Sequence, residues 1–208
     1  MSLTLIIVIL TCLVSYLAFN NRELHSKLSH IPYVELRKKE YYRMLSSGFV
    51  HGGWVHLGIN MFVFWQFGEF VEQTFGQIFG EGMGRLNFLL LYVLSIIFAD
   101  LATFIKHKDN PSFASVGASG AVSAILFSYL IFAPWHYIYL YGIIPIPTIV
   151  AAVAYVLYSS WASKNRSDHV DHDAHLYGAI FGFLFTLVLK PELFSFFLAQ
   201  LMQGPSSL

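Results

Sequence analysis

The chain has 208 residues, of which 56% are hydrophobic and only 12% are charged, about half the roughly 25% charged residues of a soluble domain. Its mean hydropathy is +0.61, and twelve Lys and Arg balance twelve Asp and Glu, so charge gives no support for nucleic-acid binding. A single cysteine, Cys12, excludes a disulfide framework and a cysteine-based zinc cluster. The composition therefore indicates an all-α, polytopic membrane protein.

Six apolar segments predict helices that cross the bilayer, each near the roughly 17–25 residues that a crossing needs. Their approximate bounds are residues 3–19, 54–70, 86–104, 117–132, 143–161 and 175–189. The first is interpreted as a retained span, because it lacks the charged start and small-residue exit of a signal peptide. No length is left for a soluble domain, so residues 1–208 are predicted to form one six-helix membrane domain.

The links between these segments differ in character. Residues 20–47 form a link too long for a simple connector, and their mixture of charged and Tyr side chains predicts a structured element lying in the membrane interface. A solvated loop is the alternative. Residues 71–85 are predicted to be a Gly-rich turn, and residues 163–174 a polar loop. The tail from residue 192 onward is left open between a short surface helix and no regular structure.

Polar residues in three of the six segments are predicted to lie at a similar depth in the bilayer, toward one membrane face. Gly117-Ala118-Ser119-Gly120 opens the fourth segment and His175 opens the sixth, while His56 and Asn60 lie in the first half of the second. Spans separated by one other span run in the same direction, so all these residues lie toward the same membrane face. Polar groups within spans are costly and are by default candidates for a functional site.

The residue types suit nucleophilic catalysis. A serine hydroxyl needs a base to become a nucleophile, and the pKa of histidine suits that task near neutral pH. His56 and Asn60 are four residues apart on one helix face, so both are able to donate hydrogen bonds to an oxyanion, as is the backbone N–H of Ser119. The alternative for this pair is an interhelical hydrogen bond that only holds the bundle together.

The chain resembles the rhomboid intramembrane serine proteases, in their compact six-span bacterial form. The motifs that carry the resemblance are Gly117-Ala118-Ser119-Gly120, the series His175-x-x-Gly178-x-x-x-Gly182, the second-segment residues His51, His56 and Asn60, and the first-link pair Tyr42-Arg43. The resemblance implies that Ser119 is the nucleophile and His175 its base, without a cofactor or a metal. It also implies transmembrane proteins as substrates, entering laterally near the second and fifth spans.

Further roles follow from the same resemblance. The residues implied to support the oxyanion and the site are His56, Asn60, His51, Gly117 and Ala118. The residues assigned structural roles are Gly178, Gly182, Arg43 and Glu72. Close helix packing at the two glycines is also expected from their size alone.

The chain departs from the family pattern at two positions. One turn after the nucleophile the family often has an aromatic residue that packs on the base, but this chain has Ser123, so what orients His175 is left open. Tyr42 replaces a commoner Trp. Asp171 and Asp173 are interpreted as polar loop residues. Asp100 is left open between a position in the cavity and a local pair.

The distribution of positive charge conflicts with the orientation that the resemblance implies. The Lys and Arg residues on the active-site side are Arg22, Lys27, Arg37, Lys38, Lys39, Arg43, Lys106, Lys108, Lys164 and Arg166. The positive-inside rule would place that side in the cytoplasm. The resemblance implies cytoplasmic termini and an active site that opens to the extracytoplasmic side of a bacterial inner membrane, and we adopt that orientation.

Two other functions remain open. His169, His172 and His175 are spaced by three and, with His51 and His56, are candidates for a metal site, although an exposed polar loop is the simpler interpretation of the first two. A non-catalytic relative that binds membrane clients is the second alternative, although such a protein needs neither a serine nor a histidine at these positions. The sequence assigns neither a natural substrate nor an oligomeric state.

Overall fold

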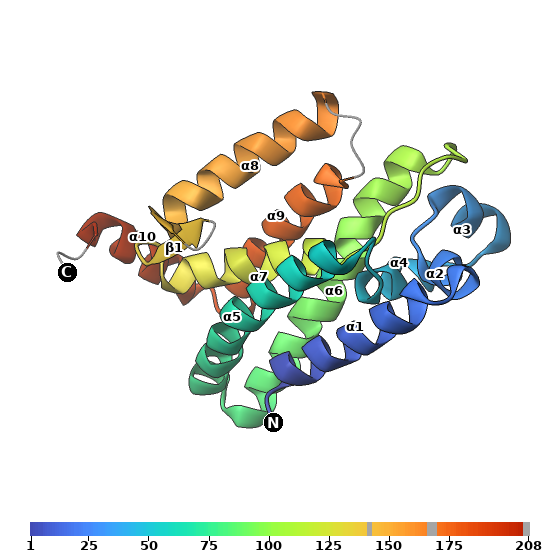
Figure 1. The fold of residues 1–208 in the computed structure, drawn as a ribbon. Coiled ribbons are helices and arrows are strands. Elements are labelled where there is room, and N and C mark those ends of the chain that lie inside the picture. Colours follow the sequence, from blue (N-terminus) through green and yellow to red (C-terminus); the bar gives the residue numbers. More distant parts are fainter. Residues whose placement is uncertain (141–142, 166–169, 206–208) are drawn as a thin grey trace.

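The computed structural model describes residues 1–140, 143–165 and 170–205, and these are predominantly helical (Figure 1). Each of the six predicted segments overlaps one long helix. The helices are α1 (Leu3–Phe19), α5 (Trp54–Phe79), α6 (Glu81–His107), α7 (Ser119–Phe132), α8 (Thr148–Asn165) and α9 (His172–Leu189). The first agrees with its predicted bounds, and the others differ at one or both ends.

The first link is a folded unit of short helices. Its elements are α2 (Arg22–Leu28), α3 (Pro32–Lys38), α4 (Arg43–Ser46) and the 3-10 turn η1 (Ser47–Phe49). Arg43 is buried and connects them: its guanidinium donates to the backbone carbonyls of Ser26 at 2.6 Å and Lys27 at 2.7 Å, and it pairs with Glu40 at 2.6 Å. A structured link was therefore the right prediction, and the solvated-loop alternative is wrong.

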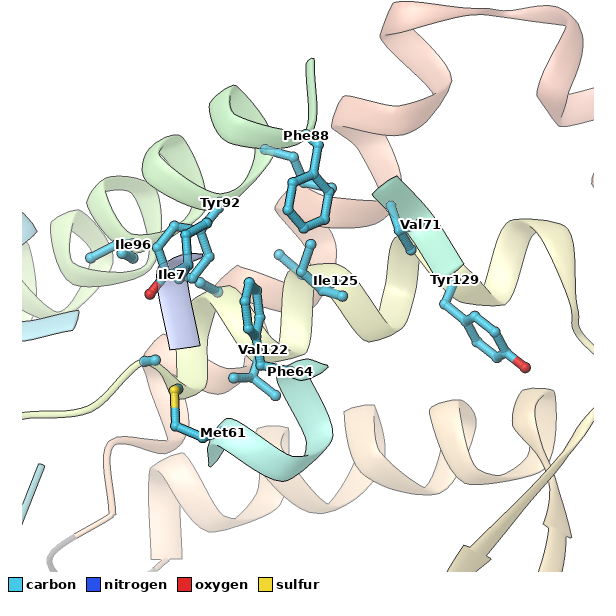
Figure 2. Close-up of a cluster of buried hydrophobic side chains, with 14 of the residues drawn as sticks. Ile7, Met61, Phe64, Val71, Phe88, Tyr92, Ile96, Val122, Ile125 and Tyr129 are labelled. Atoms are coloured by element: carbon cyan, nitrogen blue, oxygen red, sulfur yellow. The ribbon is translucent and has the colours of Figure 1, made fainter. Parts of the chain in front are cut away.

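Helix α7 lies in the middle of the bundle, between α5, α6 and α9 (Figure 1). Buried residues occur around its whole circumference, as expected for a helix that is apolar on every side. Figure 2 shows the core on one flank, where Val122 and Ile125 of α7 meet Phe64 of α5 and Phe88 and Tyr92 of α6. The segment that begins at Ser119 is thus fixed by packing from several sides.

Helices α7 and α9 approach each other closely because α9 has glycines at the contact. A Cβ atom on Gly178 would overlap the carbonyl oxygen of Gly120, and one on Gly182 would overlap the carbonyl oxygen of Ala124. Further along, the Thr186 hydroxyl reaches the Ser128 hydroxyl at 2.8 Å. Only glycine permits this approach, which holds the start of α9 beside the start of α7.

The second link is helical except at Gly80, so the predicted turn is present but is much shorter than residues 71–85. Helix α5 continues to Phe79 and α6 begins at Glu81, which leaves Gly80, with φ 80°, as the only residue between them. The backbone of Gly84 packs directly on that of Gly76, since a Cβ on Gly84 would lie 2.5 Å from the Gly76 nitrogen. Among the glycines of this link, Gly76 and Gly84 therefore serve close contact between two helices.

The fifth segment begins as a strand rather than a helix. Strands β1 (Tyr137–Leu140) and β2 (Ile144–Pro147) pair antiparallel, with Tyr137 opposite Pro147. Strand β2 contains Pro145 and Pro147. Proline lacks the N–H that a helix needs, so α8 begins only after Pro147. The tail forms α10 (Glu192–Gln203), whose Leu193 and Phe197 pack against α7 and α9.

Two helices among the described residues, α6 and α9, are long and apolar enough to cross a membrane. Helices α1 and α7 are apolar but shorter. Large apolar side chains face outward on the surrounding helices, such as Leu13 on α1, Trp65 on α5 and Leu157 on α8. Such side chains suit contact with lipid. The count of six crossings stays a prediction.

Candidate active site

The Gly117-Ala118 turn that precedes α7 is fixed by its neighbours. Gly117 has φ 125°, a conformation that favours glycine, and its N–H donates to the carbonyl of Ser47 at 3.0 Å. A Cβ at this position would lie 2.7 Å from Cε1 and 2.9 Å from Nε2 of His56. Both the backbone conformation and the lack of space for a Cβ atom therefore require glycine at position 117. The contact places the imidazole of His56 directly against the turn.

Ser119 is the first residue of α7 and is half-buried. The first turn of an α-helix leaves its backbone N–H groups without partners inside the helix, and it carries the positive end of the helix dipole. The hydroxyl and the N–H of Ser119 are thus at the end of a rigid helix that favours negative charge.

His175 lies in the first turn of α9, which begins at His172. The side chain of Asp171 caps this helix by accepting from the Ala174 N–H at 2.9 Å, and it also accepts from the Thr103 hydroxyl of α6 at 2.9 Å. Asp173 lies in the same turn and pairs with Lys106 at 2.5 Å. Asp173 lies inside α9, so its interpretation as a loop residue was wrong, whereas Asp171 immediately precedes the helix. Both side chains tie the start of α9 to α6.

Ser119 and His175 line one cavity of about 450 Å³, here called the site cavity, together with His56 and Asn60. Ser123 of α7 and Tyr155 of α8 also line it. The four residues that the sequence placed at one depth of the bilayer are therefore brought together around a single space.

His51 joins the first link to the serine turn. Its Nε2 accepts from the Ala118 N–H at 3.3 Å, and its Nδ1 lies 3.0 Å from the Ser15 hydroxyl of α1. That hydroxyl donates its hydrogen to the Phe49 carbonyl, so His51 Nδ1 must be the donor to Ser15. His51 is therefore neutral, and burial followed by the neighbouring His56 lowers its pKa to about 3.

His56 and Asn60 are one turn apart on α5. His56 Nδ1 accepts a weak hydrogen bond of 3.4 Å from the Gly52 N–H, which leaves the hydrogen of the neutral ring on Nε2, the atom beside Gly117. Asn60 is 6% exposed and uses one amide hydrogen on the His56 carbonyl at 2.9 Å. Each side chain thus has one N–H left for a group in the site cavity.

A buried polar cluster lies beneath the turn and outside the residues that line the site cavity. Ser47 donates to Asp100 at 2.6 Å, and Asp100 is 3.9 Å from His30, whose Nδ1 is 2.7 Å from Glu35. Asp100 therefore forms a local pair. Burial alone would lower the pKa of His30, but the carboxylates of Asp100 and then Glu35 outweigh burial and raise it.

Glu72 holds the start of α1 against α5, far from the site cavity. Its carboxylate accepts from the backbone N–H groups of Leu3 and Thr4 and from the Thr4 hydroxyl, each at 2.8 Å. A carboxylate at a helix N-terminus is favoured by the helix dipole. Arg85 lies 3.8 Å away on the same carboxylate.

No group of three His, Cys, Asp or Glu side chains within the described ranges has an arrangement that would hold a metal ion. His172 and His175 are in ring contact at 6.0 Å. His169, the third histidine of the candidate metal site, lies outside the described residues.

Residues 38–192 match the Rhomboid domain family model. The chain belongs to the rhomboid family. Similar proteins include RHOMBOID-like protein 4 of Arabidopsis thaliana, 35% identical over 74% of this chain and 36% of the relative. Rhomboid-like protein 11, chloroplastic, of the same plant is 28% identical over 72% and 53%. Rhomboid protein 1, mitochondrial, of Saccharomyces cerevisiae is 32% identical over 68% and 40%. The rhomboid chain thus spans about half or less of these relatives' length.

Membership of the rhomboid family makes the chain an integral membrane protein of a group that generally consists of intramembrane serine proteases. The roles of two residues near the site, Asp171 and Tyr155, could not be recognised from the sequence of this rhomboid. Asp171 was recognisable as a helix cap only once the start of α9 was known, and Tyr155 was hidden in an apolar segment. Tyr155 now stands beside His175, with ring centroids 6.0 Å apart.

Proposed function

We propose that this rhomboid is an intramembrane serine endopeptidase that cleaves transmembrane segments of membrane proteins through a Ser119–His175 dyad. The observation that carries the proposal is that Ser119 and His175 line the same site cavity, at the starts of two helices in direct contact. Asn60 and His56 line it from a third helix. A nucleophile, a base and spare N–H donors around one space are the parts that acyl transfer needs.

The proposed reaction begins when Ser119 Oγ attacks the carbonyl carbon of the scissile peptide and passes its proton to His175. The resulting oxyanion is stabilised by the Ser119 N–H and by the remaining N–H groups of His56 and Asn60. His175 then protonates the leaving nitrogen, the C–N bond breaks, and an acyl-enzyme is left on Ser119. Water, deprotonated by His175, attacks the ester and restores the free serine.

The substrate is proposed to reach the site cavity from the lipid, between α5 and α8. The apolar residues Ile59 and Val63 of α5 and the ring of Tyr155 of α8 are part of the cavity lining. A substrate helix must unwind locally, because an intact helix uses its own carbonyls in hydrogen bonds. We further propose six crossings by residues 1–208 as one domain, and an active site that opens to the extracytoplasmic side of a bacterial inner membrane.

The test uses the purified chain in detergent and a fluorophosphonate probe, which labels only an activated serine. We expect the probe to label the parent and not to label Ser119→Ala or His175→Ala. Cleavage of a reconstituted transmembrane substrate should be lost in the same two variants. A well-folded parent that takes up no probe and cleaves no substrate would sink the proposal and favour the client-binding alternative.

A further inference from the structure

The imidazole of His175 packs against an aromatic ring that comes from a different helix. Tyr155, in the middle of α8, is half-buried, and its ring lies nearly parallel to that of His175, with an interplanar angle of 24° and centroids 6.0 Å apart. This separation falls within the range of favourable aromatic pairs. The ring therefore restricts the face of the imidazole that borders α8.

The hydroxyl of Tyr155 is tied to the helix that carries the nucleophile. Tyr155 Oη lies 2.5 Å from the Ser123 hydroxyl, and Ser123 donates its single hydrogen to the Ser119 carbonyl at 2.7 Å. Ser123 has no second hydrogen to give, so the Tyr155 hydroxyl is the donor. A continuous series of hydrogen bonds thus runs from Tyr155 through Ser123 to the backbone of Ser119.

The small side chain of Ser123 makes this arrangement possible. Ser123 is 4% exposed and lies one turn after Ser119, where a large side chain would occupy the space that the Tyr155 ring fills. Phe127, one further turn along α7, supports the ring at a centroid distance of 6.0 Å. The ring is held at its hydroxyl end by Ser123 and by a tilted contact with Phe127, while it also contacts His175.

We propose that Tyr155 is the positioning residue for His175, and that it makes the geometry of the dyad depend on the position of α8. The inference rests on the proposed function, in which His175 is the base. Helix α8 contacts α9 and α7, and it exposes apolar side chains such as Val153 and Leu157. A displacement of α8 would carry the Tyr155 ring away from His175, so substrate entry beside α8 and the readiness of the base are coupled.

The test compares Tyr155→Leu, which removes the ring, with Tyr155→Phe, which keeps the ring and removes only the hydroxyl. The full chain in detergent is assayed for the fluorophosphonate labelling rate, for kcat and KM with a transmembrane substrate, and for Tm. The Leu variant should lose up to about 100-fold in labelling and kcat, as expected for a misplaced base, with a smaller change in KM. The Phe variant should stay within about tenfold of the parent, since it loses one hydrogen bond.

Tyr158→Leu is the matched control. Tyr158 lies one turn further along α8 and packs edge-on against His172, with centroids 5.6 Å apart. The control should label near the parent rate. Equal losses in Tyr158→Leu and Tyr155→Leu would mean that general α8–α9 packing is responsible, and would overturn the proposal, as would parent-like labelling by Tyr155→Leu.

A second pair of variants removes single oxygen atoms and avoids a large cavity. Ser123→Ala and Tyr155→Phe each break the same hydrogen bond, so the double variant should label no more slowly than the slower single variant. Multiplied losses, or a Phe variant as slow as the Leu variant, would contradict the positioning role. A parent that is not labelled at all would remove both this inference and the proposed function, whereas a labelled parent with unaffected Tyr155 variants would remove only this inference.

Discussion

Replacement of Gly182 by alanine is expected to separate α7 from α9 and so to reduce both stability and activity. The added Cβ would lie 2.5 Å from the Ala124 carbonyl carbon, and still closer to its oxygen, whereas real Cβ atoms essentially never come within 3.0 Å. Carbon atoms pack at about 3.5–4.0 Å, so the two backbones must move apart by roughly 1 Å. Such overpacking costs about 1–3 kcal/mol of the free energy of unfolding.

The same displacement is expected to act on the proposed Ser119–His175 dyad, because His175 is two helical turns from Gly182 on α9. A shift of about 1 Å at a catalytic group lowers rates by as much as about 100-fold. Denaturant unfolding in micelles and fluorophosphonate labelling measure the two effects. The control is Gly82→Ala on α6, where the added Cβ would have no neighbour within 4 Å. If Gly182→Ala matched this control in both measurements, the close contact of α7 and α9 would not be what fixes the relative positions of Ser119 and His175, and the reasoning would be refuted.

Three further predictions concern the residues around the site. His56→Ala and Asn60→Ala should each lower kcat by about 10- to 1000-fold, as expected for the loss of one oxyanion donor, and unchanged rates in both would remove them from that role. Glu72→Gln should cost about 1.5–3 kcal/mol in unfolding free energy, because hydrogen bonds to a charged acceptor are lost. The control is Glu23→Gln, whose side chain is 81% exposed and whose replacement should cost nothing measurable in the same assay. The folded-state pKa of His51 lies at about 3, below its unfolded value of 6.5. The contribution of this group to the free energy of unfolding is therefore fully present above pH 6.5 and is lost as the pH falls toward 3. The unfolding free energy should decline by about 1.4 kcal/mol per pH unit from this group between pH 6 and pH 4, and a pH slope in His51→Gln equal to the parent's would contradict the argument.

The site motifs could be predicted from sequence because they depend on direction and spacing. Ser119, His56 and His175 stand at the same ends of alternate helices, and connectivity alone places those ends on one side. Hydrophobic segments likewise marked where helices occur. The rhomboid assignment from these motifs is confirmed by the match of residues 38–192 to the Rhomboid domain family. The roles of the individual residues stay predictions.

Other features were missed because they depend on contacts that spacing does not encode. Gly76 and Gly84 are turn formers by residue type, yet here they allow two helix backbones to touch. Pro145 and Pro147 interrupted an apolar segment that composition alone treated as one helix, and the structure begins α8 after them. Tyr155 stands in an apolar stretch where an aromatic residue is ordinary, and its contact with His175 arises only from the packing of α8 on α9.

The shortness of α7 has a consequence for where the proposed chemistry takes place. Its 14 residues extend about 21 Å at a rise of 1.5 Å per residue, whereas the hydrocarbon layer is about 30 Å thick. In the proposed six-crossing arrangement, with the Phe132 end of α7 placed at one boundary of that layer, Ser119 would lie about 9 Å inside the other. In the proposed mechanism, the water that hydrolyses the acyl-enzyme would have to descend to the serine, and Asn60, His56 and His175 give the site cavity polar groups along that path. In the proposed mechanism a thicker bilayer would lengthen that descent, so hydrolysis of the acyl-enzyme is expected to slow as the bilayer thickens.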